Sequence, residues 1–489
     1  MKKQLLQIFL SAIVVMAGMG CSKSYFDINN NPNAATNTTP ELVLPQALTV
    51  SASGYINNYT FVSEWLGYWC PSGSYAISSS DLASYRQTTA FGNGIWAAAY
   101  HNLEDYDYVE QTAKAQAKTF YQGTAMIMKA FVFQQLVDMF NNVPYTQAFK
   151  GTNVIQPAYD NAQTIYESLA GRLDTAVALL QRSDAIAASS SDVMFNGVNS
   201  NWIKFANTLK LRILMRQTQM SGRTSYIQAQ IAKIMANGGG FLSSDAAVNP
   251  GYANNSGQQS PFWGLCINTS GTYIGDYWRA NQYPITFCQA NADPRYKLWY
   301  APTASGGIYQ GNVIGSATNH AANSASTFGP GVLQSVSQSA VLLSAAESYF
   351  LQAEAGLKGL LTNNPQTLFN SGVQASFTYL GAGDATSYVN QVANINTNYA
   401  ACTTPAQQLA CIIRQKWAAM NTVTPFEAWA DYRRLGLPAD IPLSVSPYVD
   451  VLAIPVRILY PTSEYQNNAA NVSAQGTINH HTSKIFWMP

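Results

Sequence analysis

The chain has 489 residues, of which 47% are hydrophobic and only 10% are charged, and its formal net charge is +1. An ordinary soluble protein carries roughly 25% charged residues, so neutral polar groups must keep this surface wet. A nearly neutral chain lacks the basic footprint that nucleic acid or anionic lipid requires, and we expect no nucleic-acid partner.

The N-terminus has the layout of a secretory signal. Two lysines precede a largely apolar run at residues 5–16, and small residues follow before Cys21. The run is shorter than the ~20 residues of a membrane-spanning helix, and no later stretch is apolar for that long. We predict a signal peptide over residues 1–20 and a mature protein that does not cross a bilayer.

Cys21 stands at the small-residue cleavage site, an arrangement that resembles the lipobox of bacterial lipoproteins. In that pattern the cysteine becomes the new N-terminus and carries acyl chains such as palmitate, and each buried CH₂ contributes about 0.8 kcal/mol to membrane binding. Gly18 occupies a position that usually holds leucine, so an ordinary cleaved signal is the alternative. We predict that Cys21 is lipidated and that residues 21–40, rich in Asn, Pro, Ser and Thr, form an extended tether.

After this tether the dominant signal is helical. Apolar residues recur at steps of three and four, the spacing that lines one face of a helix. This spacing predicts buried faces formed by Met126, Ala130, Phe133, Val137 and Phe140; by Ile165, Leu169, Leu173, Ala176 and Leu180; by Trp202, Phe205, Leu209 and Ile213; by Leu343, Ala346, Phe350, Ala353 and Leu357; and by Leu409, Ile413, Trp417 and Met420. We expect the last two helices to pack together, within one helical domain over residues 41–489.

Local signals predict where some helices begin and end. A capping box places an acceptor side chain three residues before Glu or Gln, and it is matched by Asp160 with Gln163 and by Thr424 with Glu427. Gly436 predicts the end of the helix that Thr424 begins.

Between about residues 237 and 341 the helical period is lost, and Gly, Ser, Asn, Tyr and Trp fill the chain. Structureless connections longer than ~15 residues are uncommon in a compact protein unless they are functional. We therefore predict a loop-rich insertion over about 237–341 and place the ligand site partly in it.

Five cysteines remain when Cys21 is set aside, so at least one must stay unpaired in a compartment where disulfides form. Cys402 and Cys411 flank a short loop and are the first candidates for a disulfide, followed by Cys266 and Cys288. Cys70 is the fifth. Because none of the spacings is typical of a metal site, we predict no metal and no cofactor.

The composition suits an uncharged, hydroxyl-rich ligand, because aromatic rings pack on the C–H faces of sugars while amides pair with hydroxyls. An extracytoplasmic protein that merely tolerates this composition explains it equally well. The candidates for ligand stacking are two groups of aromatic residues, one near the front of the chain and one in the irregular middle. They are Trp65, Tyr68, Trp69, Tyr75 and Trp96, and then Trp263, Tyr273, Tyr277 and Trp278.

Charge is concentrated at residues 427–434 in a chain that has little of it. We interpret this block as a buried ion-pair network that fixes the terminal helices, in preference to a functional site. Glu347 and Glu354 lie two turns apart on one helix face, and Glu354 can pair with Lys358 four residues later. Scaffold roles are favoured for these carboxylates over paired catalytic ones.

A secreted glycoside hydrolase or esterase is the rival from the enzyme class. It would need two positioned carboxylates or an activated nucleophile, and the sequence contains no G-x-S-x-G, no H-E-x-x-H and no complete G-x-G-x-x-G. With only 4 histidines, histidine-based catalysis is poorly supplied. We predict no catalytic residues and a protein that is not an enzyme.

Several stretches follow one another in an order that is typical of one protein family. They are FDINNNPN at 26–33, LVDMFNNVPYTQA at 136–148, WIKFANTLKLR at 202–212, DPR at 293–295, AEA at 353–355, RQKW at 414–417, EAWADYRRLG at 427–436 and PVR at 455–457. Together they extend over nearly the whole mature chain, and they are similar to the SusD/RagB family, in its SusD-like lipoprotein branch. Family members typically have Gly-Asp where this chain has Asn141 and Asn142.

The resemblance implies an all-α fold of tetratricopeptide-like helix pairs with an irregular region that carries the ligand surface. It implies a lipid-anchored protein on the outer surface of the outer membrane, which caps a SusC-like TonB-dependent barrel and delivers glycans or, in some branches, peptides. No motif carries over the binding positions of starch-binding relatives residue by residue. A purely structural or adhesion lipoprotein is the remaining alternative.

Overall fold

The computed structural model describes residues 38–57, 59–75 and 78–489. The predicted signal peptide, the lipidation at Cys21 and most of the predicted tether lie outside the described residues. The chain divides into one unit over Met1–Thr39 and a compact unit over Pro40–Pro489. The helices and strands of the described residues all belong to the second unit.

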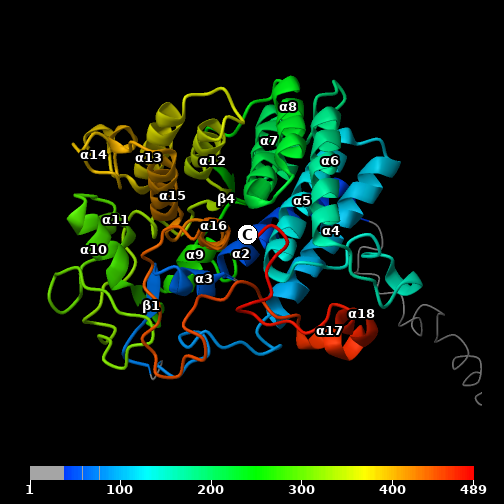
Figure 1. Ribbon diagram of the computed structural model, residues 1–489. Helices are drawn as coiled ribbons and strands as arrows, with labels where there is room; N and C mark the ends of the chain where they lie inside the picture. The colour runs from blue at the N-terminus through cyan, green and yellow to red at the C-terminus, as the bar shows by residue number, and fades with distance from the viewer. Residues whose placement is uncertain (1–37, 58, 76–77) are drawn as a thin grey trace, which may run out of the picture. The chain divides into compact units, whose positions relative to one another are not determined.

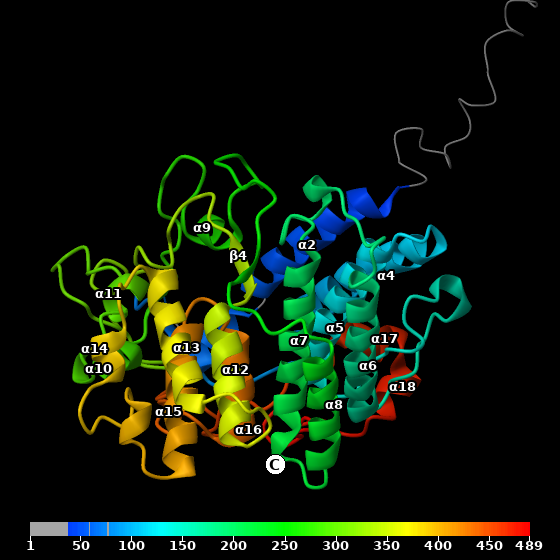
Figure 2. The same ribbon diagram turned by 90° about the horizontal axis from the view of Figure 1, so that it is seen from above.

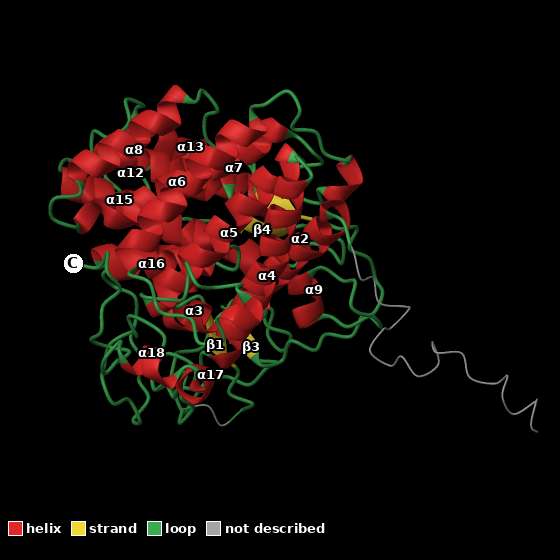
Figure 3. Ribbon diagram, turned by 90° about the vertical axis from the view of Figure 1, so that its right-hand side faces the viewer, coloured by secondary structure: helices red, strands yellow, loops and turns green. Residues whose placement is uncertain are grey.

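Helices build this compact unit, and the strands of its described residues form two small pairs (Figures 1 and 3). The strands are β1 (Trp69–Pro71), β2 (Ala246–Val248), β3 (Trp278–Ala280) and β4 (Ala340–Leu343), with β1 paired to β3 and β2 to β4. The helices are α2 (Pro40–Asn57), α3 (Thr60–Trp65), α4 (Asn93–Ala115), α5 (Thr119–Phe140), α6 (Ala162–Leu180), α7 (Asn199–Arg216), α8 (Thr224–Ala236), α9 (Pro261–Cys266), α10 (Gln282–Ala290), α11 (Tyr296–Trp299), α12 (Ala345–Leu357), α13 (Pro365–Leu380), α14 (Thr386–Val389), α15 (Pro405–Met420), α16 (Pro425–Leu435), α17 (Thr462–Asn467) and α18 (Ala469–Ser473). The all-α prediction is confirmed.

The long helices form two groups that meet along α7 (Figure 2). In the first group α4, α5, α6 and α7 each pack against the next helix, and in the second α12 packs against both α13 and α15. The predicted packing of α12 and α15 is therefore confirmed. Contacts of α7 with α12 and α16 join the groups.

The predicted apolar faces are buried in α5, α6, α7 and α15, apart from partly buried Leu409. Among the residues predicted to lie on α12, Leu343 is buried but does not belong to the helix, because it is the last residue of strand β4. The helix begins at Ala345, where the side chain of Ser344 accepts a hydrogen bond from the Glu347 N–H. An apolar residue just before a helix start fits the helical spacing by chance, so periodicity alone could not place this boundary.

The capping box predicted at Asp160 is wrong by one residue. Asn161 is the N-cap of α6, and its side chain accepts from the Thr164 N–H at 3.1 Å. Asp160 turns back instead and accepts from the backbone N–H groups of Tyr145 and Thr146, both at 2.9 Å. It thereby fixes the turn after α5.

The second predicted cap is right in position but not in bonding. Thr424 is the N-cap residue of α16, yet its side chain does not cap the helix and contacts Met420 Sδ at 2.7 Å. Glu427 points to Arg216 and does not bond the cap. Gly436 ends the helix with a φ of +66°, as predicted, because a left-handed C-terminal residue favours glycine.

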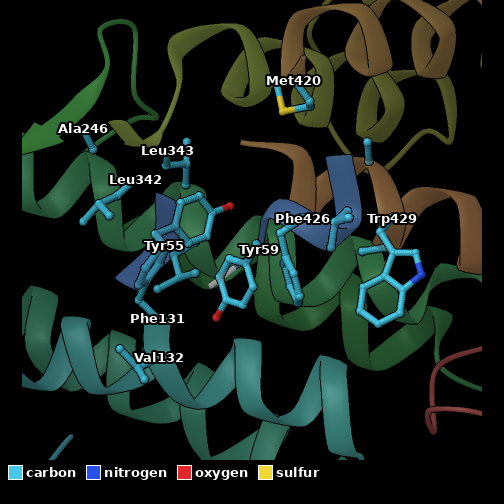
Figure 4. Packing of buried hydrophobic residues seen from close by; sticks show 14 of the residues in the cluster. Tyr55, Tyr59, Phe131, Val132, Ala246, Leu342, Leu343, Met420, Phe426 and Trp429 are labelled. Atoms are coloured by element: carbon cyan, nitrogen blue, oxygen red, sulfur yellow. The ribbon is translucent and has the colours of Figure 1, made fainter. Parts of the chain in front are cut away.

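Aromatic residues from distant parts of the chain fill the centre of the core (Figure 4). The ring centroid of Tyr59 lies 5.4 Å from that of Tyr55 on α2 and 4.9 Å from that of Phe426 on α16. Phe131 of α5 contacts Tyr55 from the other side, at 5.7 Å. Tyr59 lies between α2 and α3, so the junction of these two early helices packs against the late helix α16, which α3 also contacts.

A buried ion-pair network supports the junction at α7. Arg212 donates to Glu347 of α12 at 2.7 and 2.9 Å, and Arg216 bonds both Glu427 of α16 and Asp138 of α5. The five side chains are 0% exposed. Such ions are tolerated in a core only when each one is paired.

The network continues through α16. Arg434 donates to Glu354 of α12 at 2.6 and 2.7 Å and to Asp431 at 2.8 Å, while Lys416 of α15 lies 2.7 Å from Asp431. The neighbouring cations hold the pKa of Asp431 well below its usual range, against the opposing effect of burial. The network predicted from residues 427–434 is confirmed.

The predicted disulfides are not formed. Cys70, Cys266, Cys288, Cys402 and Cys411 are all buried and free. Cys402 and Cys411 nevertheless lie together, and a hydrogen bond from the Cys411 thiol lowers the pKa of Cys402. Their short separation in the sequence predicts that the two thiols lie close together, but not whether they form a disulfide.

Candidate functional site

The short pair of strands β1 and β3 brings the front and middle groups of aromatic residues together. The pair is antiparallel, with Cys70 opposite Arg279 and Pro71 opposite Trp278. Tyr75 follows β1 closely and Tyr277 immediately precedes β3. The loop-rich insertion thus contributes one half of the site, and the start of the folded chain contributes the other.

Tyr75, Tyr277 and Trp278 form what we call the aromatic surface. The ring centroid of Tyr277 lies 5.2 Å from that of Tyr75 and 4.7 Å from that of Trp278, both edge to face. Tyr75 is 44% exposed and the other two are half-buried. Burial raises the pKa of Tyr277 to about 12, so its hydroxyl stays protonated at neutral pH.

Trp69 supports the aromatic surface from below. Its ring centroid lies 5.8 Å from that of Trp278, and its indole N–H donates to Thr422 at 3.0 Å. Phe328 packs on its other side at 4.8 Å. Because Trp69 is only 3% exposed, it orients the surface rings and presents little area of its own.

Arg279 fixes the backbone that carries these rings. Its guanidinium donates to the carbonyl oxygens of Gly275, Trp278 and Ala322 at 2.9, 2.7 and 2.8 Å, and to Asp276 at 3.1 Å. At 3% exposure it is a buried cation with four partners. This role of Arg279 could not be predicted, because a lone arginine in an irregular segment gives no sign of which backbone groups it will bond.

A close backbone approach holds the loop before Tyr75. The Ser72 N–H donates to the Tyr277 carbonyl at 2.7 Å, and the Gly73 N–H donates to that of His320 at 2.8 Å. A Cβ atom at Gly73 would lie 1.9 Å from the Asn319 carbonyl oxygen. Only glycine therefore permits this contact.

The remaining candidates of the front group lie elsewhere. Trp65 is 1% exposed and packs in the core against Phe61 at 4.8 Å. Tyr68 is 0% exposed, and its hydroxyl donates to the Trp417 carbonyl at 2.7 Å. Since neither ring has an accessible face, we leave both out of the proposed site.

Trp96 belongs to a separate pocket. A cavity of about 310 Å³ is lined by Trp96, Tyr100, His101, Glu104 and Phe149, among others. The Trp96 ring is 6% exposed and packs against Tyr100 at 4.9 Å. The structure does not bring this residue to the aromatic surface.

Trp263 and Tyr273 are half-buried neighbours of the site. Trp263 lies on the short helix α9, whose Phe262 packs against Trp69 at 6.1 Å. The Tyr273 hydroxyl is hydrogen-bonded to Thr327, and burial raises its pKa to about 12. These two residues flank the aromatic surface and are secondary candidates.

An unpaired carboxyl group lies within the core near the site. Glu64 is 0% exposed, and neither of its carboxyl oxygens has a hydrogen-bond partner among the described residues. Burial raises its pKa to about 8. Glu64 lies on α3, which contacts β1.

Two features are absent from the part of the chain that the structure describes. No group of three or more His, Cys, Asp or Glu side chains is placed there to hold a metal ion. No helix there has the length and apolar character to span a membrane.

Known solved structures share this fold. A SusD homolog from Bacteroides uniformis is 21% identical, with a TM-score of 0.77 over 91% of this chain and 99% of that one. A SusD-like protein from Bacteroides thetaiotaomicron is 24% identical, with a TM-score of 0.77 over 92% and 98%. A chitin-binding SusD homolog from Flavobacterium johnsoniae is 22% identical, with a TM-score of 0.77 over 91% and 98%.

A family model also matches the chain. No curated protein matches the chain. The model of a SusD-like family described as starch-binding and associating with the outer membrane matches residues 32–461. The shared fold confirms the helical, tetratricopeptide-like scaffold. Because the match spans most of the 489 residues, this chain belongs to this SusD-like family, which is described as starch-binding and associating with the outer membrane.

Proposed function

We propose that this protein is a lipid-anchored, cell-surface member of its family that binds a neutral glycan on the aromatic surface and passes it to a SusC-like TonB-dependent barrel, without cleaving it. The observation that carries the proposal is the assembly of Tyr75, Tyr277 and Trp278. The fold collects these rings from distant parts of the chain and leaves each partly exposed. Because each ring keeps part of its surface exposed, that aromatic area is available to a ligand.

The surroundings of the rings favour an uncharged ligand. Arg279, the buried cation behind them, already donates to backbone carbonyls and to Asp276. A guanidinium with engaged donors has little left for an anion. The amide of Asn319, beside the loop before Tyr75, is already bonded to Val313. His320, however, is exposed, and the ring nitrogen that does not bond Gln310 can pair with a hydroxyl.

The comparisons with known proteins suggest which oligosaccharides to use first in binding experiments. The family description names starch, and the structural relative from Flavobacterium johnsoniae is described as chitin-binding. Maltoheptaose and chitohexaose are therefore suitable first ligands. A peptide of similar length serves as the third probe, because the resemblance leaves peptide ligands open.

The aromatic surface is tested by titration calorimetry. We expect Tyr75→Ala and Tyr277→Ala each to raise Kd for the bound oligosaccharide at least tenfold, which corresponds to about 1.4 kcal/mol. Tyr465→Ala is the matched control, because Tyr465 is 40% exposed and lies on α17. Unchanged affinity in both surface variants would refute this site. Shortened oligosaccharide after incubation would refute binding without turnover.

The anchor and the partner need a cellular test. We expect tagged full-length protein, extracted from outer membranes in detergent, to carry with it a TonB-dependent barrel identifiable by mass spectrometry. Cys21→Ser removes the sulfur that would be acylated, so this variant should leave the membrane fraction. Repeated recovery of no barrel would favour a stand-alone binding or adhesion protein, and a membrane-bound Cys21→Ser variant would exclude the lipid anchor.

A further inference from the structure

A polar groove lies in the second group of helices. Its volume is about 810 Å³, within the roughly 300–1,000 Å³ of ligand sites. The start of α12, one face of α13, helix α14 and residues 243–245 form its walls, and these helices adjoin one another in Figures 1 and 2. None of the residues of the aromatic surface contributes to it. We call it the polar groove.

The face of α13 that lines the groove is polar along its length. It presents hydroxyl and amide side chains at steps of three and four residues, where a helix packed against a neighbour would carry apolar ones. The opposite face supplies the buried Phe369, Val373 and Phe377 to the core. The polar set is Thr367, Asn370, Ser371, Gln374 and Thr378.

Two tyrosines and one carboxylate give the groove unused hydrogen-bonding capacity. Tyr349 and Tyr379 are half-buried in its wall, and neither hydroxyl has a partner among the described residues. Burial raises the pKa of Tyr379, so its hydroxyl remains a donor. Asp245 accepts from the Ala345 N–H at 2.7 Å through Oδ1, which leaves Oδ2 without a partner in the described chain.

The lining selects among ligand classes. It includes no lysine or arginine, so it offers no cation to a phosphate or carboxylate group. Its aliphatic residues are three alanines and Val389, which provide no deep pocket for the hydrophobic anchors of a peptide. Neutral amides, hydroxyls, tyrosine rings and one acceptor carboxylate are the groups that pair with a polyhydroxylated chain.

We propose that the polar groove is a second ligand site, which binds a neutral oligosaccharide independently of the aromatic surface. The choice of a sugar rests on the proposed function, whereas the location rests on the groove alone. A second site would let one protein hold two stretches of a long glycan, and binding both at once raises the overall affinity.

The test combines a blocking variant with the aromatic-surface double variant. Ser371→Trp places a large ring in the groove without disturbing the core, since Ser371 is half-buried on the polar face. Gln366→Trp is the matched control, because Gln366 is exposed on the same helix and does not line the groove. Tyr349→Phe with Tyr379→Phe removes the two hydroxyls and keeps both rings. Each protein is titrated with maltoheptaose and with chitohexaose in a calorimeter.

The proposal expects residual binding of one probe by the Tyr75→Ala, Tyr277→Ala protein. Adding Ser371→Trp, or the two Tyr→Phe changes, should raise the Kd of that residual binding at least tenfold, and Gln366→Trp should not. Loss of all binding in the aromatic-surface variant, with no effect of Ser371→Trp on the wild type, would overturn the groove and leave the proposed function standing. Binding that only Ser371→Trp removes would support the groove and move the proposed function away from the aromatic surface. Binding of neither probe by the wild type would contradict both proposals.

Discussion

Replacing Arg434 with methionine is expected to lower the free energy of unfolding by about 3–5 kcal/mol, the loss typical of a broken buried ion pair. The guanidinium holds two carboxylates, those of Glu354 and Asp431, and the side chains are at most 2% exposed. Methionine replaces the apolar stem of arginine but not its guanidinium, so both buried carboxylates lose the hydrogen bonds of Arg434. Urea unfolding followed by circular dichroism measures the effect, and a large drop in melting temperature should accompany it.

The matched control is the same change at an exposed pair. Arg182 lies 2.7 Å from Asp184, but their side chains are 58% and 50% exposed. Arg182→Met is expected to change the stability far less, because water solvates Asp184 once its partner is removed. If Arg434→Met were as mild as Arg182→Met, the network would not be what holds the junction of α7, α12 and α16.

Glu64→Gln is expected to change how stability depends on pH. The folded carboxyl group keeps its proton up to pH about 8, whereas the unfolded chain releases it near the ordinary value of 4.5. Folding therefore favours the protonated form, and stability is lost as pH rises through this window. Between pH 5 and pH 8 the loss amounts to about 3–4 kcal/mol, at roughly 1.4 kcal/mol per pKa unit.

Glutamine cannot ionise, so the variant should lack this loss. Relative to the wild type, Glu64→Gln is expected to gain about 3–4 kcal/mol when the pH is raised from 5 to 8. The difference between the two proteins isolates Glu64 from the other carboxyl groups. Glu104→Gln, at an exposed position, should leave the stability unchanged at both pH values. A difference that stays constant with pH would mean that Glu64 is solvated or paired in solution.

Much of the scaffold could be predicted from the sequence because long helices repeat their apolar spacing over many residues. The buried faces of α5, α6, α7 and α15 follow this spacing, and so does the ion-pair block of α16. The first and last residues of the helices could be predicted less well. Asp160 and Asn161 are both good caps, and only the turn that ends at Thr146 decides which of them caps α6.

The candidate site was predictable in its ingredients but not in its assembly. Strands of three residues, such as β1 and β3, show no period of their own, so nothing in the sequence joins Pro71 to Trp278. Composition also does not separate a buried ring from an exposed one. Trp65 and Tyr75 stand in the same aromatic stretch, yet the first is 1% and the second 44% exposed.

The polar groove was missed for a related reason. Aromatic residues in irregular segments stand out in the sequence, because no core period explains them. In the sequence, the polar stripe on α13 looks like an ordinary solvent-exposed helix face, because the sequence does not show which residues lie opposite it. Asp245 is separated from Tyr349 and Tyr379 by the whole region that includes β3, α10 and β4.

The order in which the core is completed has a consequence for how fast the chain folds. The indole of Trp487 donates to Asp138 at 2.7 Å across 349 positions of sequence, and Arg216 reaches Glu427 across 211. Residues so far apart in the sequence can come into contact only after a long loop has closed, and the entropy lost in closing it slows folding. Arg216 thus lacks its partner Glu427, and Asp138 lacks the hydrogen bond from Trp487, until most of the chain is present. Folding is expected to be slow and to finish as one late, cooperative event.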